Sequence, residues 1–404
     1  MRRLSKLPVG ATNTGWRLLL LRDLAVSGGI QTGPFGSQLK ASEYQTAGVP
    51  VVMPQNISGG SIDEACVART SATKAQSLAR HRLRAGDVVF SRRGDLAKIA
   101  VADSRHTDWI CGTGCLRARL DPDRVDSAYL RYYLMQPFPL HWLQSQALGQ
   151  TLLNLNTTIV GQLPILLPEI QEQRRIAATL ATWDEAIEKT ERLIHFADAR
   201  LRGLTRRLVD ARCNTWPHEH LDHVFRAVSR KAPNGTQPLS VTQDRGVVPR
   251  TEMERRIAAS DQSVAAYKHM RPGDFAVSLR SFEGGLEHSE YEGGVSAAYT
   301  VLRPALSIDA RFYKYFFKSD TFVGRYLAKS VVGIRDGKQI DMAGLLITAI
   351  PLPPIDEQRR IADVLDEARH EIDLLTRLKQ RYELQRRGLE QRLLTLPDTQ
   401  RAAS

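Results

Sequence analysis

The sequence predicts an α+β protein in which two mixed α/β lobes are joined by two long helices that pair antiparallel within the chain. Three observations lead to this prediction: a duplicated segment, a sustained apolar repeat in each copy, and weaker matches between the two intervals. We expect lobe one over residues 1–166, a helix over 167–213, lobe two over 214–351 and a second helix over 352–404. The 404 residues, 42% hydrophobic and 25% charged, are typical of a folded chain of two or three domains.

The duplication is the strongest signal in the sequence. The 42 residues from Leu167 match the 42 residues from Leu352 without a gap, and 18 positions are identical at an offset of 185. Each copy opens with the pattern Pro-x-x-x-Glu-Gln-x-x-Ile-Ala-x-x-Leu. Self-similarity of this kind indicates an internal repeat.

Each copy is predicted to form one helix of about 40 residues, which at 1.5 Å per residue spans roughly 60 Å. Apolar residues recur every three or four positions over at least four heptads, as in a coiled-coil seam. The seam residues are Ile176, Leu180, Trp183, Ile187, Ile194, Ala197, Leu201, Leu204 and Leu208, then Ile361, Leu365, Ala368, Ile372, Leu375, Tyr382, Leu389 and Leu393. Two matching stripes in one chain can pair with each other. The alternative is that each helix lies in the core of its own domain.

Two polar residues interrupt the second stripe. Lys379 and Arg386 fall on seam positions, where we expect the helix pairing to loosen or a partner to bind.

The lobes share a skeleton and differ in detail. Arg84-Ala-Gly-Asp-Val-Val-Phe-Ser recurs as Arg271-Pro-Gly-Asp-Phe-Ala-Val-Ser, a turn that runs into a buried strand. Asp126-Ser-Ala-Tyr-Leu-Arg-Tyr-Tyr-Leu recurs as Asp309-Ala-Arg-Phe-Tyr-Lys-Tyr-Phe-Phe, a short amphipathic helix.

The net charge of +12 permits nucleic acid, an anionic membrane surface or an acidic protein as partner. Residues 16–166 hold 16 basic and 11 acidic side chains, residues 214–351 hold 18 and 15, and the two helical segments are close to neutral. The lobes are therefore the better candidates for contacting nucleic acid. Four cysteines, no recognisable signal peptide and no apolar stretch of about 20 residues favour a cytoplasmic protein.

The motifs of common catalytic sites are missing from the sequence. It contains no GxxxxGK[ST] loop, no GxGxxG turn and no Asn-Pro-Pro-aromatic signature of adenine methyltransferases. Cys111 and Cys115 are expected to be buried thiols, because no second pair has zinc-site spacing. The sequence therefore predicts a binding protein without metal or cofactor of its own.

Several motifs resemble those of the specificity subunits of type I restriction-modification enzymes. They are Gly33-Pro-Phe-Gly-Ser-Gln-Leu-Lys40, Gly48-Val-Pro-Val-Val, Gly86-Asp-Val-Val-Phe-Ser-Arg92 and the two helix openings. Gly284-Gly-Leu and Gly294-Val-Ser-Ala-Ala-Tyr299 resemble a second class of recognition domain. Lobe two lacks the Gly-Pro-Phe-Gly opening, which leaves open which bases it reads.

The resemblance implies a non-catalytic subunit that binds double-stranded DNA. Each lobe would be a target recognition domain that reads one half of a bipartite, asymmetric site, and the helices would set the gap between the halves. The helices would also dock two methyltransferase subunits, which carry S-adenosylmethionine, and in some complexes two ATP-dependent restriction subunits.

Candidate DNA-binding residues follow from the loops that the resemblance marks and from side-chain chemistry, since Arg pairs with guanine and Asn or Gln with adenine. They are Gln31, Thr32, Ser37, Gln38, Lys40, Arg92, Arg93, Lys98, Thr151, Asn154 and Asn156 in lobe one, and Arg280, Phe282, Arg335 and Lys338 in lobe two. The alternatives are structural: the Gly33–Gly36 turn can be needed for its backbone conformation, and Asn154 can cap a helix.

Candidate partner-binding residues lie at the start of the two helices, where one polar patch recurs although the seam does not require it. They are Glu172, Gln173, Arg174, Arg175, Glu357, Gln358, Arg359 and Arg360. Two copies of one patch suit two copies of one partner. The alternative is that the glutamates stabilise the helix N-termini.

Two other functions remain open on the sequence alone. The chain can be a DNA-binding regulator that acts without a methyltransferase, or a coiled-coil assembly protein whose lobes bind proteins.

Overall fold

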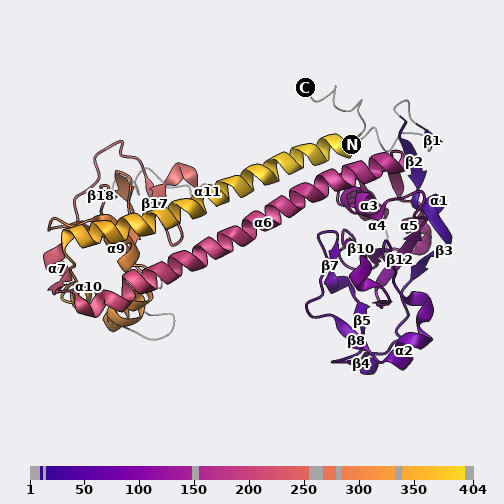
Figure 1. The fold of residues 1–404 in the computed structure, drawn as a ribbon, viewed down its shortest axis with the longest axis horizontal. Coiled ribbons are helices and arrows are strands. Elements are labelled where there is room, and N and C mark those ends of the chain that lie inside the picture. The colour runs from indigo at the N-terminus through magenta and orange to yellow at the C-terminus, as the bar shows by residue number, and fades with distance from the viewer. Residues whose placement is uncertain are drawn as a thin grey trace. The chain divides into compact units, whose positions relative to one another are not determined.

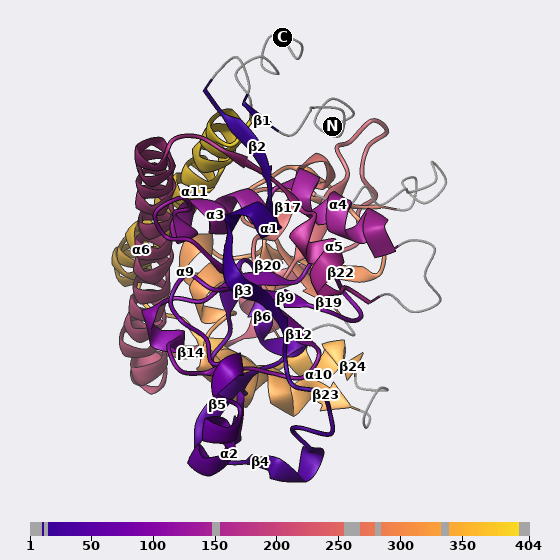
Figure 2. The same cartoon turned by 90° about the vertical axis from the view of Figure 1, so that its right-hand side faces the viewer.

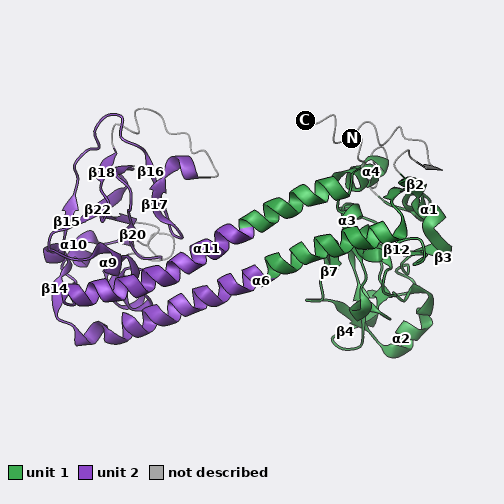
Figure 3. Cartoon of the chain, turned by 45° about the horizontal axis from the view of Figure 1, so that its top comes forward, with its two compact units in different colours: residues 1–188, 380–404 green, residues 189–379 purple. Residues whose placement is uncertain are grey.

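The computed structural model (Figure 1) describes residues 10–11, 15–147, 154–253, 267–278, 284–332 and 339–395. Its contacts divide the chain into two compact units, of which unit 1 comprises residues 1–188 and 380–404 and unit 2 comprises residues 189–379 (Figure 3). Each unit combines one lobe with the adjoining stretches of both long helices. The predicted α+β fold is confirmed, while the division at residues 166, 213 and 351 stays a prediction about domains.

The two long helices are α6 (Ile170–Leu208) and α11 (Ile355–Leu393), each of 39 residues. They run side by side (Figures 1 and 3). In unit 1, Ile176 and Leu180 near the start of α6 share a core with Leu389 and Leu393 at the end of α11. This pairing of a beginning with an end makes the helices antiparallel, as predicted.

The seam continues through unit 2 with the same polarity. Ala197 and Leu201, late in α6, share a core with Ile361, Leu365 and Ile372, early in α11. Ile361 and Leu365 are at most 4% exposed, since the second lobe also covers them.

The polar seam residues have partners on the opposite helix. Lys379 Nζ lies 2.9 Å from Glu191 Oε1 in unit 2, and Arg386 Nε lies 2.5 Å from Asp184 Oδ1 in unit 1. The Trp183 and Tyr382 rings meet edge to face at 5.6 Å. The predicted loosening at Lys379 and Arg386 is wrong, because carboxylates on α6 pair with both cations.

The central sheets of the two lobes have the same strand order. In unit 1 the order is β10-β9-β12-β3, with β3 (Ala25–Thr32), β9 (Val88–Ser91), β10 (Ile99–Val101) and β12 (Cys115–Leu120); β3 and β12 run next to each other in Figure 2. In unit 2 the order is β20-β19-β22-β15, with β15 (Phe225–Val228), β19 (Phe275–Ser278), β20 (Glu287–His288) and β22 (Tyr299–Pro304). All these pairs are antiparallel. The shared skeleton is confirmed.

The recurring Arg-x-Gly-Asp turn explains part of this likeness. Asp87 is 1% exposed and accepts hydrogen bonds from Arg119 Nε at 2.9 Å and Nη2 at 2.7 Å. Asp274 is equally buried and accepts the same pair of bonds from Arg303. Each arginine projects from the strand next to the one that its aspartate precedes, so the bidentate pair joins the two central strands of each sheet.

Shorter elements surround each sheet in the same sequence order. Unit 1 has β2 (Arg17–Leu20), α1 (Leu21–Leu24), α3 (Ser127–Leu134), α5 (Thr157–Gly161) and β13 (Pro164–Leu167), which correspond to β14 (His218–His220), α7 (Leu221–Val224), α9 (Ala310–Phe316), α10 (Met342–Leu346) and β25 (Ala349–Pro351) of unit 2. None of the described helices combines the length and the apolar content needed to cross a bilayer.

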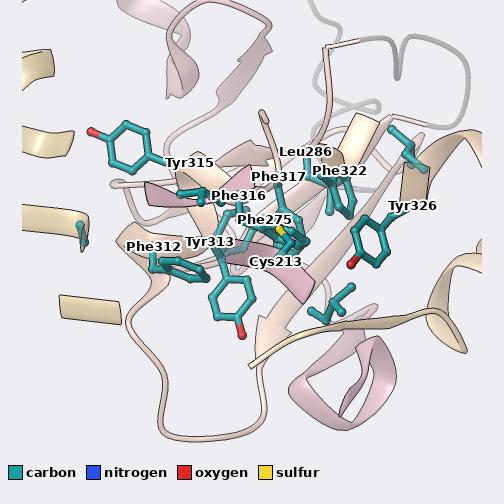
Figure 4. Close-up of a cluster of buried hydrophobic side chains, with 14 of the residues drawn as sticks. Cys213, Phe275, Leu286, Phe312, Tyr313, Tyr315, Phe316, Phe317, Phe322 and Tyr326 are labelled. Atoms are coloured by element: carbon teal, nitrogen blue, oxygen red, sulfur yellow. The ribbon is translucent and has the colours of Figure 1, made fainter. Parts of the chain in front are cut away.

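The lobes also differ, as their sequences predict. Unit 1 adds α2 (Ala72–Ser77), α4 (Pro137–Ala147) and a sheet of β4 (Tyr44–Gln45), β5 (Val49–Val52), β8 (Ala68–Thr70) and β11 (Ile110–Cys111). Unit 2 adds the pairs β16 (Leu239–Thr242) with β17 (Gly246–Pro249) and β18 (Lys268–Met270) with β21 (Gly293–Val295). Its core is rich in aromatic rings, among them Phe275, Phe312 and Phe317 (Figure 4).

A buried glutamine attaches each lobe to its long helix. Gln173 of α6 is 1% exposed; its Oε1 accepts from Asp126 N–H at 2.9 Å, and its Nε2 donates to Pro168 O at 2.9 Å and Arg124 O at 3.1 Å. Gln358 of α11 accepts from Asp309 N–H at 2.9 Å and donates to Pro353 O at 2.8 Å. Asp126 and Asp309 are the N-caps of α3 and α9, so the two clasps are equivalent.

We predict that Gln173→Met, which keeps the volume of the side chain, lowers the free energy of unfolding of unit 1 by about 1–3 kcal/mol, because it leaves buried backbone groups unpaired. Urea unfolding followed by far-UV circular dichroism measures the change. The matched control is the exposed neighbour Arg174→Met, expected to change stability by less than about 0.5 kcal/mol. Equal stability of the two variants would contradict the clasp.

Candidate nucleic-acid interface

Most of the predicted DNA-binding residues of lobe one lie at one edge of its central sheet. β3 ends at Thr32 and β9 ends at Ser91, while β12 begins at Cys115 and β10 begins at Ile99. The register pairs Leu116 with Thr32, Cys115 with Ser91 and Ile99 with Phe90. The loops 33–40, 92–98 and 112–114 therefore meet at the same edge, which we call the loop edge.

Backbone hydrogen bonds hold the loop edge together. Gly33 N–H donates to Cys115 O at 2.9 Å, and Arg92 N–H donates to Gly114 O at 2.8 Å. Leu155 N–H donates to Arg92 O at 3.0 Å, and Arg92 Nε donates back to Leu155 O at 3.1 Å. Segment 154–155 thus belongs to the same edge, although it lies about 60 residues further along the chain.

The side chains of the loop edge differ in how free they are to bind a ligand. Ser37, Lys40 and Arg93 are exposed, whereas Thr32, Arg92 and Lys98 are half-buried. Lys98 Nζ lies 3.5 Å from Pro54 O. Burial, and then the neighbouring charge of Arg93, lower the pKa of Arg92. The exposed cations are the better candidates for phosphate contacts.

Besides Arg92 and Lys98, three of the predicted DNA-binding side chains form hydrogen bonds within the protein. Asn156 Oδ1 accepts from Ile159 N–H at 2.8 Å and caps α5, so the cap considered for Asn154 is formed by Asn156 instead. Gln31 Oε1 accepts from Arg117 Nη2 at 3.1 Å, and Gln38 Oε1 accepts from Phe35 N–H at 3.1 Å. The backbones of Asn154 and Arg93 form an isolated antiparallel β-bridge. Base contacts from Gln31, Gln38 and Asn156 would therefore compete with these internal bonds.

The remaining predicted DNA-binding residues lie outside the described residues: Thr151, Arg280, Phe282, Arg335 and Lys338. The sheet register still locates the corresponding edge of lobe two. β19 ends at Ser278, which pairs with Tyr299 at the start of β22. Arg230 and Lys231, exposed just after β15, lie at this edge and are not among the predicted residues. No strand was predicted directly before them, so the sequence analysis had no signal for their position at the end of β15.

The predicted partner patch separates into buried and exposed residues. Gln173 and Gln358 are each 1% exposed and form the clasps described above, so the burial gives them a structural role instead. Arg174, Arg175, Arg359 and Arg360 are exposed. Arg175 pairs with Glu172 at 2.5 Å and holds the pKa of that carboxyl below its usual value, and Glu357 pairs with Arg212.

An apolar surface on the helices of unit 2 was missed by the sequence analysis. Leu193 and Phe196 of α6 are 53% and 67% exposed, and Leu374 and Leu378 of α11 are 50% and 36% exposed. Arg200 and Glu371 pair at 2.9 Å across the two helices, and one heptad away on each helix lie Leu193 and Leu378. The antiparallel heptad register therefore makes these leucines neighbours, with Phe196 and Leu374 one turn away on the same face. We call these four residues the apolar helix surface.

A signal for the apolar helix surface is present in the repeat. Leu193 and Leu378 are equivalent at the offset of 185, although neither belongs to the seam. An apolar residue that recurs outside the buried stripe indicates a second contact surface.

Cys111 and Cys115 lie in surroundings that disfavour a reactive thiolate. Cys111 and Cys115 are buried, as predicted, and burial raises the pKa of Cys111 to about 12. Within the described ranges, no cluster of three or more His, Cys, Asp or Glu side chains has the geometry to hold a metal ion.

Known proteins that resemble this chain are connected with type I restriction-modification systems. Residues 42–195 match the family described as type I restriction modification DNA specificity domain. A Methanocaldococcus jannaschii protein named as the type I restriction enzyme MjaX specificity subunit is 21% identical, over 96% of this chain and 95% of its own. The HsdS subunit of Thermoanaerobacter tengcongensis is 22% identical with a TM-score of 0.50, over 95% of this chain and 96% of its own.

A further solved structure supports the same fold. The type I restriction-modification S subunit of M. genitalium is 14% identical with a TM-score of 0.58, over 97% of this chain and 99% of its own. The resemblance predicted from the sequence is therefore confirmed: residues 42–195 match the family model of the type I restriction modification DNA specificity domain, and the chain resembles a type I specificity subunit over nearly its whole length.

Proposed function

We propose that this chain is the DNA-recognition subunit of a type I restriction-modification complex and reads a bipartite, asymmetric site, one half per lobe. The observation that carries the proposal is the repetition of one sheet order, β10-β9-β12-β3 and β20-β19-β22-β15, on duplicated helices. The loops at the two edges differ in sequence. Two frameworks of one kind with unlike loops suit a site with two unlike halves.

The charge of the loop edge supports DNA as its ligand. Lys40 and Arg93 are exposed, and Arg92 and Lys98 are half-buried. Cations that project from loops fixed by backbone hydrogen bonds can position a duplex through its phosphates, while neighbouring side chains read base edges. In lobe two the exposed Arg230 and Lys231 follow β15, the strand that corresponds to β3 of lobe one.

The long helices are proposed to act as a spacer and as a docking surface. A helix of 39 residues is about 58 Å long, and paired helices bend less than a single one. The chain's share of the function is recognition, and we propose that the methylation chemistry and its S-adenosylmethionine belong to methyltransferase subunits bound to the helices. Association with ATP-dependent restriction subunits is part of the same proposal.

The apolar helix surface supports docking of a protein partner. Four large apolar side chains more than a third exposed on one face of a charged helix pair are unfavourable in water, and their burial in a complex would recover about 1.5–3 kcal/mol for each fully buried side chain. The exposed Arg359 and Arg360 at the start of α11, which belong to the same unit, would then act at the rim.

The proposal predicts an adenine-methylation map. Cells that express this chain together with the methyltransferase encoded by the neighbouring gene should show methylation at one gapped motif with two unlike halves. Cells that express the methyltransferase without this chain should not. Long-read sequencing of their DNA makes the comparison. Identical methylation in both strains, with both proteins expressed and folded, would refute the proposal and favour a regulator or an assembly protein.

We also predict that the double variant Leu193→Glu and Phe196→Glu weakens binding of the methyltransferase at least tenfold, because charges replace apolar contacts at the centre of the interface. Calorimetric titration of the two proteins measures the affinity, and circular dichroism checks that the exposed substitutions leave the fold intact. The matched control is Leu384→Glu, an equally exposed leucine of α11 outside the apolar helix surface. Affinity within twofold of wild type would remove this surface from the docking proposal.

A further inference from the structure

One aromatic side chain at the loop edge is largely exposed and belongs to none of the hydrophobic cores of lobe one. Phe35 is 58% exposed. In the described part of lobe one, Val26 at 38% is the one other large apolar side chain exposed by more than a third, and it lies at the opposite end of β3. An aromatic ring left in water at this position needs an explanation outside the folding of the lobe.

The loop that carries Phe35 is fixed in place. Phe35 O accepts from Gln38 N–H at 2.8 Å and from Leu39 N–H at 3.1 Å, while Phe35 N–H donates to Gln38 Oε1 at 3.1 Å. Leu39 is 2% exposed and anchors the loop in a small core with Val51 and Ala75. The backbone of Phe35 is therefore fixed by three hydrogen bonds within its loop, while its ring stays largely exposed.

The base of the loop is equally constrained. A Cβ atom at Gly33 would lie 2.0 Å from Gly112 O, so any other residue would force the two loops apart. This explains why glycine precedes Pro34-Phe35. The conformation that presents Phe35 is built into the junction of loops 33–40 and 112–114, and the ring needs no rearrangement before it meets a ligand.

The surroundings of Phe35 match the chemistry of a nucleic acid. Lys40 follows on the same loop, and Arg93 and Lys98 lie on the neighbouring loop of the same edge. Cations bind phosphates, whereas an apolar ring among them would not be stabilised by phosphates. The face of a base is the part of a duplex that an exposed ring can bury, either by stacking or as a wedge between base steps.

We infer that Phe35 stacks on a base of the half-site that lobe one reads and unstacks that base from its neighbour. This inference rests on the proposed function and adds to it one residue that was absent from the predicted DNA-binding set. Such a contact reads how easily a base step opens, which makes Phe35 a specificity-determining residue without hydrogen bonds to base edges.

The test uses the complete complex of this chain with its methyltransferase. Duplexes contain the motif found by methylation mapping, with 2-aminopurine at one adenine position at a time. Apart from the adenines that the methyltransferase flips out of the duplex, the wild-type complex should raise the 2-aminopurine fluorescence at one position of one half-site. Phe35→Ala should abolish that rise and weaken binding about tenfold, with an unchanged dependence of log K on log salt, because no phosphate contact is lost. Phe35→Trp should retain the rise.

Matched variants separate stacking from other effects. Arg93→Ala should keep the fluorescence rise but lower the salt slope by about one, as expected for a phosphate contact. Val26→Ala, at the other end of β3, should change neither. Phe35→Ala that binds within twofold of wild type, or that binds weakly with an unchanged fluorescence profile, would overturn the inference. A wild-type complex without sequence-specific DNA binding would instead overturn the proposed function.

Discussion

The burial of one apolar stripe against its own duplicate is the constraint on which the structure depends. α6 and α11 descend from one repeated segment, and each buries its seam on the other helix and on a lobe. Two such related stripes within one chain pair here in an antiparallel arrangement. The ion pairs of Lys379 with Glu191 and of Arg386 with Asp184 then fix the register where the apolar stripe is interrupted.

Two equivalent glutamine clasps attach the lobes to the long helices. Gln173 and Gln358 each pair with the backbone of the N-cap residue of a lobe helix. From there the buried pairs of Asp87 with Arg119 and of Asp274 with Arg303 hold the central strands together. The loops at the sheet edge can vary without disturbing this chain of contacts. That separation explains how a duplicated framework can carry two different sets of loops.

The sequence predicted the elements that repeat and missed what depends on contacts between distant residues. Offset and heptad spacing were sufficient for α6 and α11, and the weaker motif matches between the lobes were sufficient for their shared skeleton. Spacing could not show that Gln173 points into lobe one, because its partner Asp126 is 47 residues away. Asn154 and Asn156 were indistinguishable as caps until the backbone of α5 was known. Phe35 and Phe196 were overlooked because exposure of an apolar side chain is a property of the fold.

We propose that the paired helices set the gap between the two half-sites, and a change of helix length tests this central proposal most directly. One heptad inserted between Asp184 and Glu191 of α6, and one between Lys379 and Arg386 of α11, would preserve the seam and lengthen the pair by about 10 Å, or about three base pairs. A methylation map of the variant should show the same two half-sites with a gap about three base pairs longer. An unchanged gap, with the methylation activity retained, would contradict the account.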